Sequence, residues 1–163
     1  MSKGKRNPSR PSAGKKNSIS NLDLAFRLFN EIGIISQLSN TQFERRLPLG
    51  MNRSQFSILN WFARVDDQAS PGRLAKAMEV TKGAITNTLK KLEAAEWIVI
   101  SADESSGRQK IVRMTSEGRE ARDAAIEAAG PLFLTFLESI QVEEIQRLIP
   151  ELERIRKVLD ESR

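Results

Sequence analysis

Two short helical patterns, followed at once by two β-like runs, constrain the fold of this chain more than any other feature. The helices are predicted over 71–78 and about 82–95, with a turn of only a few residues between them. The runs 97–101 and 110–114 are rich in β-branched residues, and a polar loop with glycine joins them, which is typical of a hairpin. This order of elements leaves few architectures open.

Local signals support both helices. Ser70-Pro71 combines an N-cap with proline at the first helical position, and Val80-Thr81 ends the first helix and caps the second. Apolar residues at helical spacing predict the two buried faces, which consist of Leu74, Ala75 and Met78 in the first helix and Ile85, Leu89 and Leu92 in the second.

Two helices joined by a tight turn form a helix-turn-helix, whose second helix can lie in a DNA major groove, and a trailing hairpin makes a winged helix. We therefore expect a mainly α fold (α+β by strict count) with a two-stranded wing. The predicted organisation is a disordered basic tail over 1–18, an N-terminal dimerisation helix within 19–50, the winged unit over 51–118 and C-terminal dimerisation helices over 119–163. Dimerisation is expected because the flanking helices have wider apolar faces than the winged core needs.

The region before the winged pair is predicted to contain two helices. The first begins near Ser20-Asn21 and ends at about Arg46, and the second begins after the N-cap Asn52. Residues 66–69 are predicted to be a loop. The second helix is expected to bury Phe56, Leu59 and Phe62.

The C-terminal region is predicted to contain two more helices. Thr115-x-x-Gly118 opens a helix that reaches about Ile140, and Gly130-Pro131 is expected to kink it. A last helix is predicted over 142–160, with a bend or a break at Pro150.

The distribution of charge is more informative than the net charge of +5. Residues 1–16 carry six basic side chains and no acidic one, so the tail supplies the whole excess. Within the remaining chain, residues 73–113 have a net charge of +3, whereas residues 114–163 have −4. Positive charge is therefore concentrated on the predicted winged unit, as nucleic-acid binding requires.

The absence of Cys, His and Tyr excludes whole classes of chemistry. No thiolate nucleophile, zinc–thiolate site or histidine base is available, so we expect no enzyme, no metal site and no cofactor. No apolar run reaches the roughly 20 residues that cross a bilayer, and the charged N-terminus lacks the apolar segment of a secretory signal. The protein is expected to be cytoplasmic, without a membrane partner.

The outward positions of the second short helix are the candidate DNA contacts. Short polar side chains suit base edges, and asparagine can pair bidentately with adenine, whereas lysines suit phosphates. The predicted recognition-helix residues are Lys82, Gly83, Thr86, Asn87, Lys90 and Lys91. Predicted wing contacts are Arg108 and Lys110, with Arg108 a candidate for the minor groove, and predicted backbone contacts are Ser70 and Arg73.

An ordered set of motifs resembles the MarR (multiple antibiotic resistance regulator) family. The set consists of Met51-Asn52-x-x-Gln55-x-x-x-Leu59, Leu74-Ala75-x-x-Met78-x-Val80, Ile85-Thr86-x-x-Leu89-x-x-Leu92-Glu93, and Arg108 followed by Thr115-x-x-Gly118. The resemblance implies an obligate dimer of winged helices that binds palindromic double-stranded DNA and often releases it when a small molecule binds. Because the chain has no thiol and no histidine, such an effector is expected to be a small organic ligand or a partner protein.

The sequence departs from the family pattern at three positions. Ser106 stands where the family usually has an aspartate two residues before the wing arginine, and Asn87 stands where a basic residue is common. Glu96 replaces the usual glycine after the recognition helix, which bears on the turn geometry because glutamate is strained at positive φ.

Several alternatives remain open at this level. Trp61, Phe62 and Arg27 are candidate ligand-pocket residues, but aromatic side chains at such spacing are more often core. The basic tail either adds non-specific phosphate contacts or only solubilises the chain. The alternative function is a winged-helix protein-interaction module without specific DNA binding.

Overall fold

The computed structural model describes residues 13–103 and 109–162, with side chains from residue 20 onward. The chain divides into two units, one up to Thr41 and one from Gln42, which are described separately. Helix α1 (Ala13–Glu44) makes up the described part of the first unit and reaches into the second. It begins earlier than the predicted Ser20-Asn21, and extending a helix costs less than nucleating one.

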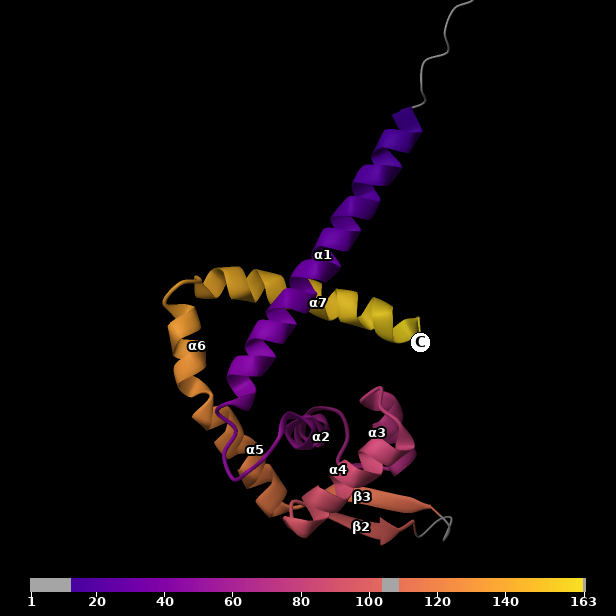
Figure 1. Cartoon of the computed structure of the whole chain (residues 1–163), viewed down its shortest axis with the longest axis vertical. Helices are drawn as coiled ribbons and strands as arrows, with labels where there is room; N and C mark the ends of the chain where they lie inside the picture. Colours follow the sequence, from indigo (N-terminus) through magenta and orange to yellow (C-terminus); the bar gives the residue numbers. More distant parts are fainter. Residues whose placement is uncertain (1–12, 104–108, 163) are drawn as a thin grey trace, which may run out of the picture. The chain divides into compact units, whose positions relative to one another are not determined.

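The second unit contains the predicted helices and hairpin in the predicted order, with one additional strand, β1 (Gln68–Ala69; Figure 1 labels the other elements). After α2 (Arg53–Arg64) come the short strand β1, α3 (Pro71–Ala77) and α4 (Lys82–Ala94). The hairpin strands β2 (Ile98–Ala102) and β3 (Lys110–Met114) follow, and α5 (Ser116–Ala128), α6 (Gly130–Leu137) and α7 (Val142–Glu161) complete the chain.

The predicted caps are confirmed. Asn52 accepts a hydrogen bond from the Gln55 backbone N–H at 3.0 Å, and the Gln55 side chain accepts one from the Asn52 N–H at 2.9 Å. Ser70, Thr81 and Thr115 each accept a hydrogen bond from the backbone N–H three residues later. Side-chain oxygens therefore set the N-terminus of every helix from α2 to α5.

The sheet has three strands, namely the two predicted wing strands and β1, which was not predicted. Its order is β1-β3-β2, and both pairings are antiparallel. Gln68 lies opposite Arg113 and Ala69 opposite Val112, so part of the predicted 66–69 loop is a strand. A two-residue strand has no sequence period, which is why only the wing strands were predicted.

One hydrophobic core holds α2, α3, α4, the sheet and α5 together. The predicted faces of α3 and α4 are buried, except that Met78 is only partly buried. In α2 the expectation is corrected: Ile58 is 1% exposed, whereas Phe56 is only partly buried and packs its ring edge against Phe43.

A close approach of backbones joins the wing to α5. The Thr115 hydroxyl donates to the Glu96 carbonyl oxygen at 2.7 Å, and the Thr115 N–H donates to the Trp97 carbonyl oxygen at 3.1 Å. A Cβ placed on Gly118 would lie 2.0 Å from that Trp97 oxygen. The Thr115-x-x-Gly118 motif is thus a packing requirement where the chain leaves the sheet.

The C-terminal helices differ partly from the expectation. The predicted kink at Gly130-Pro131 coincides with the boundary between α5 and α6. Helix α7 continues through Pro150, so no break occurs there; proline has a helical φ and removes one backbone donor. Among the described residues no single helix could span a membrane; only the pair Ser116–Leu137 and Val142–Glu161 has the required length and composition, and its axes turn by 113°.

Candidate nucleic-acid interface

Helix α4 presents one face to the core and the opposite face to solvent. Ile85, Leu89 and Leu92 are at most 3% exposed. All six residues predicted to contact DNA from this helix are exposed, namely Lys82, Gly83, Thr86, Asn87, Lys90 and Lys91. The structure therefore brings the predicted recognition residues together on a single solvent-facing surface, which we call the α4 outer face.

Three lysines give the α4 outer face its charge. In the described part of the chain, no carboxylate lies within ion-pairing distance of Lys82, Lys90 or Lys91. Their ammonium groups are consequently available to an external anion such as a nucleic-acid phosphate.

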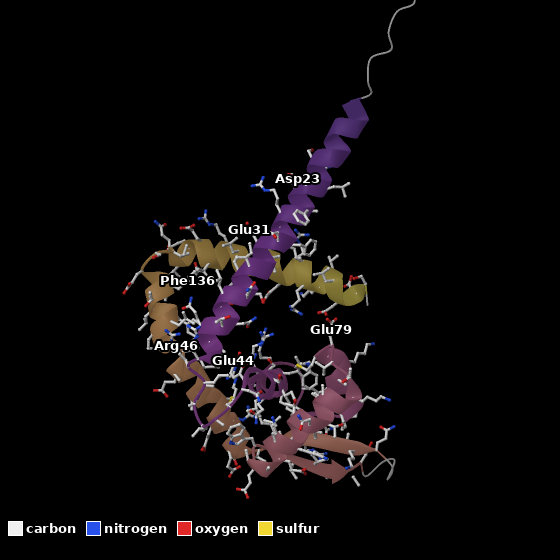
Figure 2. The ribbon with its side chains drawn as sticks, viewed as in Figure 1. Asp23, Glu31, Glu44, Arg46, Glu79 and Phe136 are labelled. Atoms are coloured by element: carbon white, nitrogen blue, oxygen red, sulfur yellow. The ribbon has the colours of Figure 1, made fainter. Side chains whose placement is uncertain are left out.

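Two glutamates in left-handed backbone conformation fix the turns on either side of α4. Glu79 ends α3 with φ of 53°, and Glu96 follows α4 with φ of 61° (Glu79 is labelled in Figure 2). The Val80 N–H donates to the Ala75 carbonyl, and the Trp97 N–H donates to the Leu92 carbonyl, as in Schellman motifs. Glu96 therefore adopts the left-handed conformation in which glycine is usual at the end of a Schellman motif, and its backbone is strained.

Arg73 is tied into the fold. Its guanidinium forms an ion pair with Asp66 and lies 5.1 Å from the centroid of the Trp61 ring. The hydrogen bond from Arg73 holds the pKa of Asp66 below its ordinary value. Ser70, the other predicted backbone contact, caps α3 by accepting from the Arg73 N–H at 3.2 Å. The ion pair is made through Nη1 of the half-exposed Arg73 side chain, so the remaining guanidinium N–H groups can contact a phosphate while the pair with Asp66 persists.

The wing is described only in part. Arg108, the predicted minor-groove residue, lies outside the described residues. Lys110 is exposed at the start of β3, opposite Ala102, and Arg113 on the same strand donates to the Ser101 hydroxyl at 3.3 Å. The hairpin thus places one predicted cation, Lys110, next to the segment that contains Arg108.

A cavity of about 340 Å³ lies between α2 and α7, and its lining includes Asn60, Trp61, Arg64, Met78 and Arg156. Two arginines line it, and one of them, Arg156, forms an ion pair with Asp160 at 3.2 Å, so an anionic organic ligand would find its main positive charge at Arg64. Of the predicted pocket residues, Trp61 lines this cavity, whereas Phe62 is 4% exposed and belongs to the core. Arg27 belongs to the first unit.

Sequence reasoning missed Asn60 and Arg156 in this lining. The Asn60 side-chain oxygen accepts two hydrogen bonds from Arg122 of α5, at 3.0 and 3.4 Å. No local motif singles out either residue, because each is one polar position among many in an amphipathic helix. No group of three or more potential metal-ligating side chains exists within the residues that the structure describes.

Fold and surface together define the class of winged helix-turn-helix proteins. The sequence model of the MarR family matches residues 49–109. The HTH-type transcriptional repressor Rv2887 of Mycobacterium tuberculosis is 31% identical over 108 residues, which cover 64% of this chain and 77% of that protein. The chain therefore belongs to the MarR family, a family of DNA-binding transcriptional regulators and not of enzymes.

Solved structures agree with this assignment. The transcriptional regulator BldR from Sulfolobus solfataricus is 30% identical, with a TM-score of 0.69 over 86% of this chain and 97% of that one. A mutant MarR from E. coli complexed with operator DNA is 21% identical, with a TM-score of 0.66 over 82% of this chain and 96% of that one. The predicted winged helix-turn-helix fold is thus confirmed.

Proposed function

We propose that the protein is a homodimeric regulator that binds a near-palindromic operator with one α4 in each of two successive major grooves. The observation that carries this proposal is the α4 outer face, where three lysines without a carboxylate partner flank short polar side chains. Lysines fix the protein on phosphates, while the polar side chains between them read base edges.

Lys110 and Arg108 of the wing, and Ser70 and Arg73 at the start of α3, supply further contacts in this proposal. Arg73 contacts a phosphate with the guanidinium N–H groups that its ion pair with Asp66 does not use. A dimer requires two recognition helices roughly 34–36 Å apart, one helical turn of B-DNA.

Large exposed apolar side chains support the dimer. They recur along α1, α6 and α7, where an isolated chain would leave them in water. Examples are Leu22, Phe26, Ile35 and Leu38 in α1, Leu134 and Phe136 in α6, and Leu148 and Leu152 in α7 (Figure 2 labels Phe136).

A small organic anion is the effector that the cavity between α2 and α7 favours. Arg64 supplies positive charge, Arg156 adds to it beside its ion pair with Asp160, and Trp61 supplies an aromatic wall. Because ligand and DNA select between the same states, each weakens the binding of the other by the same factor.

Titration of a fluorescent promoter fragment at two salt concentrations tests the proposal. We expect sequence-preferring binding that weakens steeply with salt, because phosphate contacts release counterions. Binding without salt dependence or sequence preference would reject the regulator and leave the alternative, a winged-helix protein-interaction module.

A further inference from the structure

Thr86 on the α4 outer face has already used its only hydrogen-bond donor. Its hydroxyl donates to the Lys82 carbonyl oxygen, one turn earlier, at 2.7 Å. A threonine hydroxyl has a single proton, so what remains for a partner is the oxygen as an acceptor and the γ-methyl group. Thr86 is exposed, and both of these are available to DNA.

Asn87, the next residue, differs from Thr86 in the hydrogen bonding of its side chain. It is exposed, and no described group forms a hydrogen bond with its amide. The amide offers two donors and one acceptor in one plane, the arrangement that pairs with N6 and N7 of adenine. Gly83 lies one turn before Asn87 and has no side chain, so the amide has room to reach a base edge.

Neither side chain is a common reader of guanine. The common guanine contact is a bidentate one from arginine or lysine to O6 and N7, which are both acceptors. Thr86 has no free donor for them, and Asn87 matches adenine better. A threonine methyl group, in contrast, packs against the C5-methyl group of thymine.

We propose that Thr86 and Asn87 specify adjacent A·T pairs in each half-site, with Asn87 pairing with adenine and the Thr86 methyl group contacting thymine. This inference rests on the proposed function and adds the base preference. Lys82, Lys90 and Lys91 then set affinity on all sequences, and the two uncharged residues set the choice of base.

The test uses the full-length protein and the operator duplex selected from a random pool. Replacing the contacted thymine by deoxyuracil removes only its methyl group, and replacing the adenine by 7-deaza-adenine removes only N7. We expect each replacement to weaken binding by about fourfold per half-site, the value of one buried methyl group or one lost hydrogen bond.

Variants assign these losses to residues. Thr86→Val keeps a methyl group at that position and loses the internal bond and the hydroxyl acceptor, neither of which the proposed thymine contact uses, so it should keep parental affinity and sensitivity to deoxyuracil. Thr86→Ser should bind thymine and deoxyuracil equally, and Asn87→Ala should bind adenine and 7-deaza-adenine equally. Thr88→Val is the matched control, because Thr88 makes the same bond to Ala84 at 3.1 Å but is half-buried beside α2.

The outcomes separate the two proposals. If the parent protein binds selectively but with equal affinity to thymine and deoxyuracil, the base preference alone is overturned. G·C pairs at these positions of the selected operator would overturn it as well. A loss of operator affinity in Thr86→Val as large as the loss in Thr86→Ser also overturns the base preference. Absence of any selective duplex binding overturns the proposed function and the inference together.

Discussion

Gly83 is a position at which the stability of the fold and the binding of DNA favour different residues. It lies in the second position of α4, and a Cβ there would meet only the Thr81 hydroxyl at 3.9 Å. Glycine in a helix costs roughly 0.5–1 kcal/mol relative to alanine, so stability alone favours another residue. Close approach of the helix backbone to a ligand gives glycine a reason to be there.

Gly83→Ala should therefore have effects of opposite sign. We expect the melting temperature to rise by about 2–3 °C, because the helix gains up to ~1 kcal/mol, while operator affinity falls. Thermal denaturation and DNA titration measure the two effects. Gly130→Ala at the start of α6, also with open space around it, is the control that leaves affinity unchanged. Unchanged operator affinity in Gly83→Ala would remove this face from the interface.

Glu96 is strained, because a side chain at φ of 61° costs about 1–2 kcal/mol that glycine avoids. Glu96→Gly should raise the free energy of unfolding by about 0.5–1 kcal/mol, since the extra freedom of glycine in the unfolded chain offsets part of the gain. Denaturant unfolding measures this change in the free energy of unfolding. Glu93→Gly, inside α4, should instead destabilise by about 1 kcal/mol. Destabilisation in both variants would contradict the assigned turn.

Caps and turns could be predicted from single residues, whereas strain and pairing could not. The N-termini of four helices could be predicted because an N-cap side chain carries its own hydrogen-bond acceptor, as in Asn52, Ser70, Thr81 and Thr115. That Glu96 would tolerate positive φ was not evident, because the Thr115 hydroxyl and the Trp97 hydrogen bonds that hold the turn come from distant or later segments.

At the scale of elements, patterns longer than one helical turn were predictable. The pair α3–α4 and the hairpin follow from periodicity and caps, but β1 has only two residues and depends on pairing with β3. The Arg73–Asp66 contact was missed for the same reason. It joins the start of α3 to the loop before β1, and only the fold brings the two charges together.

This ion pair predicts how the stability of the fold and the titration of Asp66 depend on pH. The Arg73 guanidinium lowers the pKa of Asp66, so the contact stabilises the fold above the ordinary pKa of an aspartate. That contribution is lost as the pH falls through the lowered value. Carbon NMR titration should show Asp66 titrating below its ordinary value in the parent and close to it in Arg73→Gln. An unchanged Asp66 titration in Arg73→Gln would exclude the pair.

At the scale of the whole molecule, the exposed apolar faces of the terminal helices predict a dimer of two 18.3 kDa chains. Leu134 is 66% exposed, so Leu134→Glu should leave the fold intact and shift the protein towards a monomer in sedimentation experiments. Val99→Glu, at a 49% exposed position on the sheet, is the matched control that should remain dimeric. If the Leu134→Glu variant remained dimeric, α6 would not contribute to the dimer interface.

Sequencing the DNA that the full-length protein selects from a random pool tests the central claim most directly, because half-site spacing reports binding and dimer geometry together. The α4 outer faces of a symmetric dimer predict a near-palindrome with half-site centres about 10–10.5 base pairs apart. No enriched sequence, or a single unpaired half-site, would contradict the account.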